Sequence, residues 1–361
     1  MAACRVPVNK RLPRQNDASL TETPGLASSP SSHRDGRITM AVSLFLRTLF
    51  LTLLLLGAAA THIPAASRIS DYQSVFIPFY DEDGTLLAAV RRYNRADHRH
   101  YLVLDPQRIA LSEMTAEKVL STRPAGFAAW RETPFSLALT RQTSPPYLLK
   151  NDGLRKAEHP VPGFFLTADL CPSKKPLDRD FIVTTMALPL KPPVPLALMI
   201  SGLWIQKHEA DLAWLKDQVA AGKLAITWVN HSFTHPYDPA APLEKNFLLM
   251  RKTGFTNEVL FLERLLLEQG LIPSPFFRFP GLVSDRQLIE SLRDLSLIPV
   301  GSSAWLAKGE SPQAGSIILV HANGNEPEGI RLLLSFYGKQ REAFRRGSTA
   351  LLPLREAILP R

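Results

Sequence analysis

The sequence predicts an α/β domain built on a mainly parallel sheet or barrel, preceded by a small α+β domain. From Gly163 onward, apolar strand-like runs alternate with helical runs, and repeated β-then-α units are typical of parallel sheets. Before that point, short strand-like runs joined by an Asp-Gly turn indicate a hairpin. The 361 residues, 45% hydrophobic and 21% charged, suffice for one large domain and a smaller one.

The N-terminal residues are interpreted as segments outside the fold. Residues 1–39 have no hydrophobic period and are rich in Ser, Pro, Arg and Thr, which predicts a disordered extension. Met40 stands where a signal peptide would begin, so we hypothesise that this extension is not translated. Residues 40–66 place Arg47 before an apolar stretch and then three alanines, the layout of a secretory signal. A membrane anchor through residues 41–60 is the alternative. We expect an exported protein of the periplasm or cell envelope.

Residues 67–159 are expected to form the small α+β domain. Strands are predicted in SVFIPFY, TLLAAVRRY and YLVL, with the turn DEDG between the first two, and a helix is expected over LSEMTAEKVLS. The polar, proline-containing stretches RQTSPPY and KAEHPVPG separate this domain from the next. No catalytic constellation is evident in it.

Residues 160–361 carry the alternating units. Strands are expected in FFLTAD, LALMIS, LAITWV, SPFF, LIPVG and SIILVH. Helices are expected in HEADLAWLKDQVAAG, which ends at Gly222, in TNEVLFLERLLLEQG and in SDRQLIESLRDL. The last of these begins with a capping-box pattern at Ser284 and Gln287.

Polar side chains follow several predicted strands at the point where each strand ends. These residues are Asp169, His231 and His235, Arg278, and His321. Singly, an Asp at such a junction usually forms a turn, an Arg among Phe residues packs on rings, and a His is often a satisfied core residue. Because active groups gather at the carboxyl ends of strands in such folds, their common placement predicts an active site.

The stretch HSFTH presents two imidazoles four residues apart. Pro236 and the preceding strand predict a strand-to-loop turn here, in which both rings can still converge on one cation. The stretch is not an HExxH motif, because Ser232 occupies the position of the Glu.

Taken in order, FFLTAD, NHSFTH, FRFPG, the Trp of SSAWL and IILVH resemble the motifs of polysaccharide deacetylases, the NodB-like carbohydrate esterases. The resemblance covers residues 160–325. It implies a distorted (β/α) barrel that hydrolyses N-acetyl groups of GlcNAc-containing polysaccharide in the cell envelope.

The resemblance also implies residue roles. His231 and His235 would be metal ligands, Asp169 the base, Arg278 its tether and His321 the acid. A divalent cation, zinc by its ligand type, would activate water and polarise the acetamide carbonyl. The residues expected to contact the acetylated polysaccharide are Trp305, Asn230, Pro280 and Asn323.

Two motifs depart from the family pattern. The first usually has two consecutive aspartates, the second of them a metal ligand, whereas this chain has Leu170 and then Cys171. Cys171, Asp178, Asp180 or water remain as alternatives for the third ligand. A thiolate is not a simple substitute for Leu170, because adjacent side chains in an extended segment point in opposite directions. The aspartate-rich fourth motif is replaced by GSSAW.

Two other functions stay open: a carbohydrate-binding protein that has lost activity, and a hydrolase of other non-peptide C–N bonds. A nucleic-acid partner is not expected. The formal charge is +9, but no Lys/Arg cluster is interleaved with aromatic residues. The two cysteines, Cys4 and Cys171, would leave an exported product without an internal disulfide.

Overall fold

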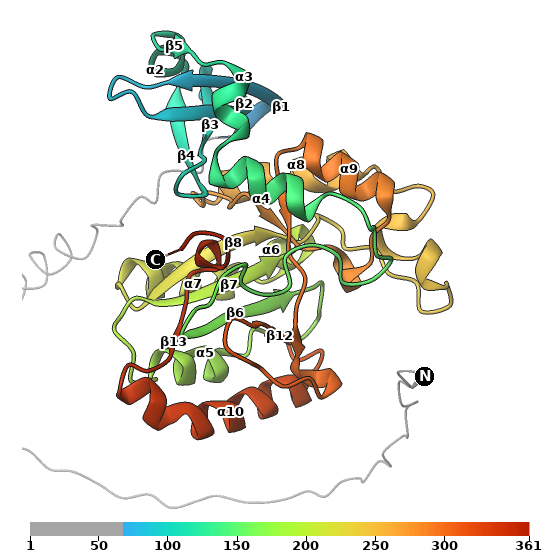
Figure 1. The fold of residues 1–361 in the computed structure, drawn as a ribbon. Helices are drawn as coiled ribbons and strands as arrows, with labels where there is room; N and C mark the ends of the chain where they lie inside the picture. Colours follow the sequence, from blue (N-terminus) through green and yellow to red (C-terminus); the bar gives the residue numbers. More distant parts are fainter. Residues whose placement is uncertain (1–67, 361) are drawn as a thin grey trace, which may run out of the picture. The chain divides into compact units, whose positions relative to one another are not determined.

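The computed structural model describes residues 68–360, which begin with an antiparallel sheet and continue as a parallel α/β domain (Figure 1). The predicted α/β class, with a distorted barrel preceded by a small α+β domain, is confirmed. The extension predicted over 1–39 and the signal or anchor predicted over 40–66 lie outside the described residues. Between residues 68 and 360, no helix has both the length and the apolar character needed to span a bilayer.

The antiparallel sheet has the strand order β4-β3-β2-β1-β5. Its strands are β1 (Ile69–Tyr80), β2 (Leu86–Arg95), β3 (His98–Asp105), β4 (Ala110–Thr115) and β5 (Arg123–Pro124), followed by α3 (Phe127–Arg131) and α4 (Pro134–Gln142). The predicted hairpin is confirmed, since β1 and β2 pair antiparallel. The Asp81 carboxylate closes the turn by accepting a hydrogen bond from the Thr85 backbone N–H at 2.7 Å.

The helix predicted over LSEMTAEKVLS is wrong in its first half. That half is β4, which pairs antiparallel with β3, and only α2 (Ala116–Leu120) is helical. Pairing with a neighbouring strand decides the structure of such a segment more strongly than its local propensity.

A buried ion pair joins the antiparallel sheet to helix α8 (Phe255–Glu268). Arg91 of β2 donates to both carboxylate oxygens of Glu263, at 2.6 and 2.9 Å, and the Tyr72 hydroxyl donates to the same carboxylate at 2.9 Å. Both charged side chains are almost fully buried. Their paired hydrogen bonds offset the cost of removing them from water.

The parallel sheet has the order β10-β9-β8-β7-β6-β12-β11, and β13 pairs with β6. Its strands are β6 (Gly163–Leu170), β7 (Val194–Ile200), β8 (Leu224–Asn230), β9 (Phe276–Phe277), β10 (Ile298–Pro299), β11 (Ala304–Trp305), β12 (Ile317–His321) and β13 (Ala350–Leu351). The remaining helices are α5 (Arg179–Met186), α6 (Gly202–Lys207), α7 (Glu209–Ala220), α9 (Arg286–Asp294) and α10 (Pro327–Arg345), with 3-10 turns η1 (Leu243–Lys245), η2 (Phe247–Leu249), η3 (Pro280–Leu282), η4 (Leu306–Lys308) and η5 (Leu354–Ala357).

Strand β6 shows how the two faces of the parallel sheet are used. Leu166, Ala168 and Leu170 join the core formed with the surrounding helices. Phe165 lies on the other face, in the core shared with the antiparallel sheet. Because side chains alternate along a strand, Asp169 shares the face of Phe165 rather than that of Leu170.

The segment 150–157, between the two polar stretches expected to separate the domains, contacts the parallel sheet near β10 and near β12, toward opposite ends of its strand order. Leu154 bridges Val300, next to β10, and Lys156 bridges Ser316, at the start of β12. The Asn151 side chain pairs with both backbone groups of Ser302, at 2.7 and 2.8 Å. This segment therefore ties together the two edges of a sheet that its own strands leave open. The predicted domain boundary at residue 159 stays a prediction.

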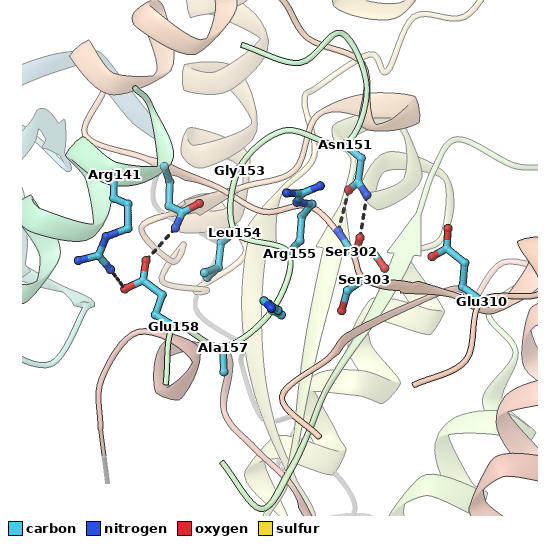
Figure 2. Close-up of a pocket in the computed structure, with 12 residues that line it drawn as sticks. Arg141, Asn151, Gly153, Leu154, Arg155, Ala157, Glu158, Ser302, Ser303 and Glu310 are labelled. Atoms are coloured by element: carbon cyan, nitrogen blue, oxygen red, sulfur yellow. Dashed lines mark hydrogen bonds and ion pairs between the residues drawn. The ribbon is translucent and has the colours of Figure 1, made fainter. Parts of the chain in front are cut away.

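A pocket of about 830 Å³ lies beside this segment (Figure 2). Figure 2 shows the Asn151–Ser302 contacts on one side of it and Glu158, paired with Arg141, on the other. None of the predicted site residues lines this pocket. It is therefore separate from the candidate site described below.

The N-terminus of α9 differs from the prediction. The helix is capped by Asp285, whose carboxylate accepts a hydrogen bond from the Leu288 backbone N–H at 2.8 Å. The expected capping box at Ser284 and Gln287 is therefore wrong. An Asp one residue later supplies the same acceptor one position closer to the helix.

Candidate functional site

The strand register aligns the carboxyl ends of the central strands. Asp169 of β6 lies opposite His321 of β12, and Asn230 of β8 lies opposite Phe277 of β9. Arg278 follows Phe277 directly, and its backbone N–H donates to the Asn230 carbonyl at 2.9 Å. Residues far apart in the chain are thus brought to one edge of the sheet.

The turn that carries the two histidines is built by the polar residues between them. The Asn230 side-chain oxygen accepts from the Ser232 backbone N–H at 3.0 Å, and the Ser232 hydroxyl accepts from the His235 backbone N–H at 3.1 Å. Ser232 and His235 both have positive φ, 65° and 47°. The Thr234 backbone N–H and hydroxyl both donate to Glu258 of α8. These contacts confirm the predicted strand-to-loop turn. They bring the centroids of the two imidazole rings to 4.7 Å from each other.

The ring orientation of His231 is set by the backbone. Its Nδ1 lies 2.8 Å from the Arg278 carbonyl oxygen, which can only accept, so Nδ1 carries the proton. The Nε2 of the neutral ring therefore keeps its lone pair, and it points toward Cys171 Sγ at 3.6 Å and Asp169 Oδ2 at 3.7 Å. Fixing one nitrogen in this way is how proteins orient a metal-binding imidazole.

Asp169 and Arg278 form a buried pair. Arg278 Nη1 donates to Asp169 Oδ1 at 2.7 Å and to the Thr167 hydroxyl at 2.8 Å, while its other nitrogens donate to the carbonyls of Val300 and Gly301. Arg278 is fully buried and Asp169 is 4% exposed.

The charges around Asp169 determine its ionisation. Burial alone would raise the pKa of the Asp169 carboxyl, but the positive charge of Arg278, with smaller contributions from the neighbouring imidazoles, outweighs burial and lowers it below its ordinary value. The carboxylate is therefore ionised at neutral pH. Its Oδ1 is committed to Arg278, which leaves Oδ2 facing the imidazole of His231.

Cys171 lies at the centre of the imidazole groups. Desolvation opposes ionisation, but the positive charge of His235 and the contacts with His231, His235 and His321 lower the pKa of the Cys171 thiol well below its ordinary value. The ligand atoms of Cys171, His231 and His235 all lie within 4.8 Å of one another. Among the alternatives for a third ligand, Asp178 instead caps α5 by accepting from the Phe181 N–H, and neither it nor Asp180 joins this cluster in residues 68–360.

His321 lies beside a carboxylate. Its Nδ1 is 2.9 Å from Glu326 Oε2, and the same oxygen accepts a hydrogen bond from Trp305 Nε1 at 2.8 Å. Burial would lower the pKa of His321, but its contacts with Cys171 and Glu326 raise it well above its ordinary value. Burial likewise raises the pKa of Glu326, and the contact with His321 more than offsets this and lowers it. The two side chains therefore favour an imidazolium–carboxylate pair.

The sequence motifs assign no role to Glu326. Its contact with His321 is a role that the sequence reasoning missed. The available signal was an acidic residue in the turn after the strand that ends in His321. This carboxylate gives His321 an acidic partner, which the serines of GSSAW do not supply.

The residues predicted to contact substrate lie in different surroundings. Trp305 is half-buried, next to His321. Pro280 is buried in η3, and Asn230 is fully buried with its amide group bonded to backbone within the chain. Asn323 is also fully buried and donates to the Cys171 carbonyl at 2.7 Å. Contact of these side chains with a substrate stays a prediction.

Comparisons with known proteins give two kinds of match. The family model described as RP012 protein N-terminal domain matches residues 70–126. Among solved structures, the chain is similar to a family 4 carbohydrate esterase from Bacillus anthracis, with 17% identity, 62% of this chain and 91% of that chain covered, and a TM-score of 0.41.

Two further structures are similar to the chain. One is the chitin deacetylase of the fungal pathogen Colletotrichum lindemuthianum, with 14% identity, 58% and 93% of the two chains covered, and a TM-score of 0.40. The other is a family 4 pseudoenzyme from Bacillus anthracis, with 14% identity, 55% and 66% covered, and a TM-score of 0.37. At these identities and TM-scores, the likeness says nothing about the activity of this protein.

Proposed function

We propose that this protein catalyses the metal-dependent hydrolysis of N-acetyl groups on GlcNAc-containing polysaccharide. The observation that carries the proposal is one cluster at the strand ends: a carboxylate held ionised by Arg278, two imidazoles beside it, and His321 opposite. It combines a base, metal-binding nitrogens and an acid within one buried site.

The donor atoms fit a divalent metal ion. His231 Nε2 keeps a free lone pair, and His235 Nε2 is buried without a hydrogen-bond partner among the described residues. Imidazole nitrogens suit zinc. When bound, zinc supplies Lewis acidity, which polarises an acetamide carbonyl and makes water a better nucleophile at neutral pH.

Asp169 and His321 divide the proton transfers between them. Asp169 accepts a proton from the attacking water through Oδ2, because Oδ1 is held by Arg278 and the lowered pKa keeps the carboxylate ionised. His321 has a raised pKa and is protonated at neutral pH, so it donates a proton to the departing amine. Glu326, 2.9 Å from Nδ1 of His321, orients the ring and stabilises its charge.

The substrate and location extend this proposal. The acetylated polysaccharide of the cell envelope is proposed because the motifs resemble those of polysaccharide deacetylases and because residues 40–66 have the layout of an export signal or a membrane anchor. Trp305, beside His321, is proposed to line the substrate pocket.

One observation favours a second candidate, a carbohydrate-binding protein without activity. Leu170 occupies the position of the family's ligating aspartate, and its side chain lies in the apolar core. A hydrolase of other non-peptide C–N bonds would use the same base and acid on a different substrate.

The test is acetate release from N-acetylglucosamine oligomers and from peptidoglycan, with and without added zinc. We expect zinc-dependent release that Asp169→Asn abolishes, while Asp180→Asn, the same change at an exposed position of α5, retains it. Glycan binding without acetate release would favour the binding protein. Cleavage of small amides with no release from any acetylated glycan would favour the other hydrolase.

A further inference from the structure

We infer that Cys171 supplies the third protein ligand of the metal, as a thiolate, so that the site is Cys-His-His. The inference rests on the proposed function only for the two histidine ligands. Cys171 would take the place among the metal ligands that is left open because the first motif has Leu170 and no second aspartate.

The direction of the side chain supports this assignment. Asp169 lies on the sheet face of Phe165, and Leu170 lies on the opposite face, against the helices. Because side chains alternate along a strand, a side chain two positions after Asp169 lies on the Asp169 face again. Cys171 follows the last residue of β6, and its sulfur lies 3.6 Å from His231 Nε2. A thiol at this position enters the site although Leu170 cannot.

The backbone around Cys171 is held from two sides. The buried amide of Asn323 donates to the Cys171 carbonyl at 2.7 Å, and the Ser201 hydroxyl donates to the Leu170 carbonyl at 2.9 Å. These contacts fix the position of the sulfur through the backbone and do not involve the sulfur atom itself. Buried groups of this kind orient a ligand before the metal arrives.

The atoms that face the sulfur are not satisfied within the chain. His235 Nε2 is buried and has no hydrogen-bond partner among residues 68–360, and the ligand atom that His235 offers lies within 4.8 Å of the sulfur and of the His231 ligand atom. A buried nitrogen without a partner is costly, so an occupant between these three atoms is expected. Asp169 is not taken as the third ligand, because its Oδ1 is bonded to Arg278 and its Oδ2 is assigned the role of base.

The donor set selects the metal. One thiolate and two imidazoles suit zinc, whereas magnesium and manganese prefer oxygen ligands. Binding displaces the thiol proton to solvent and leaves the thiolate bound to the cation. We therefore expect a site that binds zinc or cobalt and not magnesium.

The experiment uses the full-length chain, loaded with zinc and studied by X-ray absorption. We expect one sulfur neighbour at about 2.3 Å together with nitrogen neighbours at about 2.0–2.1 Å. Cobalt should give a sulfur-to-metal charge-transfer band in the near ultraviolet. Cys171→Ser should lose both signals and bind zinc at least about tenfold more weakly, since even groups outside the ligand set change metal affinity about 10- to 100-fold.

The matched control is Cys4→Ser, because the chain has only these two cysteines. It should keep both signals and the zinc affinity. Zinc-loaded wild-type protein with only nitrogen and oxygen neighbours would overturn the inference, as would a failure to bind zinc. The wild-type spectrum decides the question even where Cys171→Ser does not fold. Since neither readout uses a substrate, a sulfur-bound zinc without acetate release would refute the proposed activity and leave this inference standing.

Discussion

Replacing Arg278 by Met should destabilise the protein by at least about 3–5 kcal/mol at pH 7, the cost of breaking a buried ion pair by removing one partner. Arg278 is fully buried and its Nη1 lies 2.7 Å from Asp169 Oδ1, so the change leaves an unpaired carboxylate away from water. The figure is a lower bound, because the carbonyls of Val300 and Gly301 also lose their donor.

A second substitution tests the cause. Asp169→Asn alone should destabilise the wild type, because it leaves the charge of Arg278 unpaired. In the Arg278→Met background the same change should instead raise the free energy of unfolding, since it removes the buried charge. Contacts that act as one unit show this kind of non-additivity.

The effect should also depend on pH. The pKa of Asp169 is lowered in the folded state, so the stabilisation by the pair is present above the unfolded value and is lost as pH falls through the folded pKa. The difference in free energy of unfolding between wild type and Arg278→Met should therefore shrink in acid.

The assay is urea unfolding of the metal-free variants, followed by tryptophan fluorescence. Arg345→Met, which breaks an exposed pair with Glu342, is the control and should unfold like the wild type. The reasoning would be refuted if Asp169→Asn lowered the free energy of unfolding by the same amount in both backgrounds.

Three further predictions follow from the site and the fold. Glu326→Gln should lower the pKa of His321 and move the alkaline limb of the pH profile of kcat/KM to lower pH; an unchanged limb would show that this carboxylate does not act on the ring. Zinc at 100 times its Kd should raise the free energy of unfolding by about 2.7 kcal/mol, and His235→Ala should abolish this rise in urea titrations; a rise of equal size in the variant would exclude His235 as a ligand. Asn151→Ala should cost about 1–3 kcal/mol in the same titrations, because both backbone groups of Ser302 lose their partner, and no change would mean that segment 150–157 does not hold the sheet edges together.

Several parts of the site could be predicted because they depend on local sequence. The strands that end at or next to Asp169, Asn230 and His321 follow from apolar runs, and parallel strands bring their carboxyl ends to one edge whatever the details of the loops. The turn that carries His231 and His235 follows from the residues within it.

Other parts were decided only by contacts between distant residues. The partner of His321 proved to be Glu326, and the thiol of Cys171 proved to lie among the imidazoles; alternation along β6 allowed the second but could not bring His235 to meet it. No role was predicted for segment 150–157, because its contacts with the sheet edges are made far away in the chain.

The sequence by itself thus determined the order of strands and helices and the polar residues at the strand ends, since periodicity and turn chemistry act over a few residues. Only the tertiary structure decided which of those groups touch, which asparagines are buried in backbone contacts, and what ties the sheet edges together. Loop conformation and strand register are set by packing between elements, and local patterns do not encode the distances that packing produces.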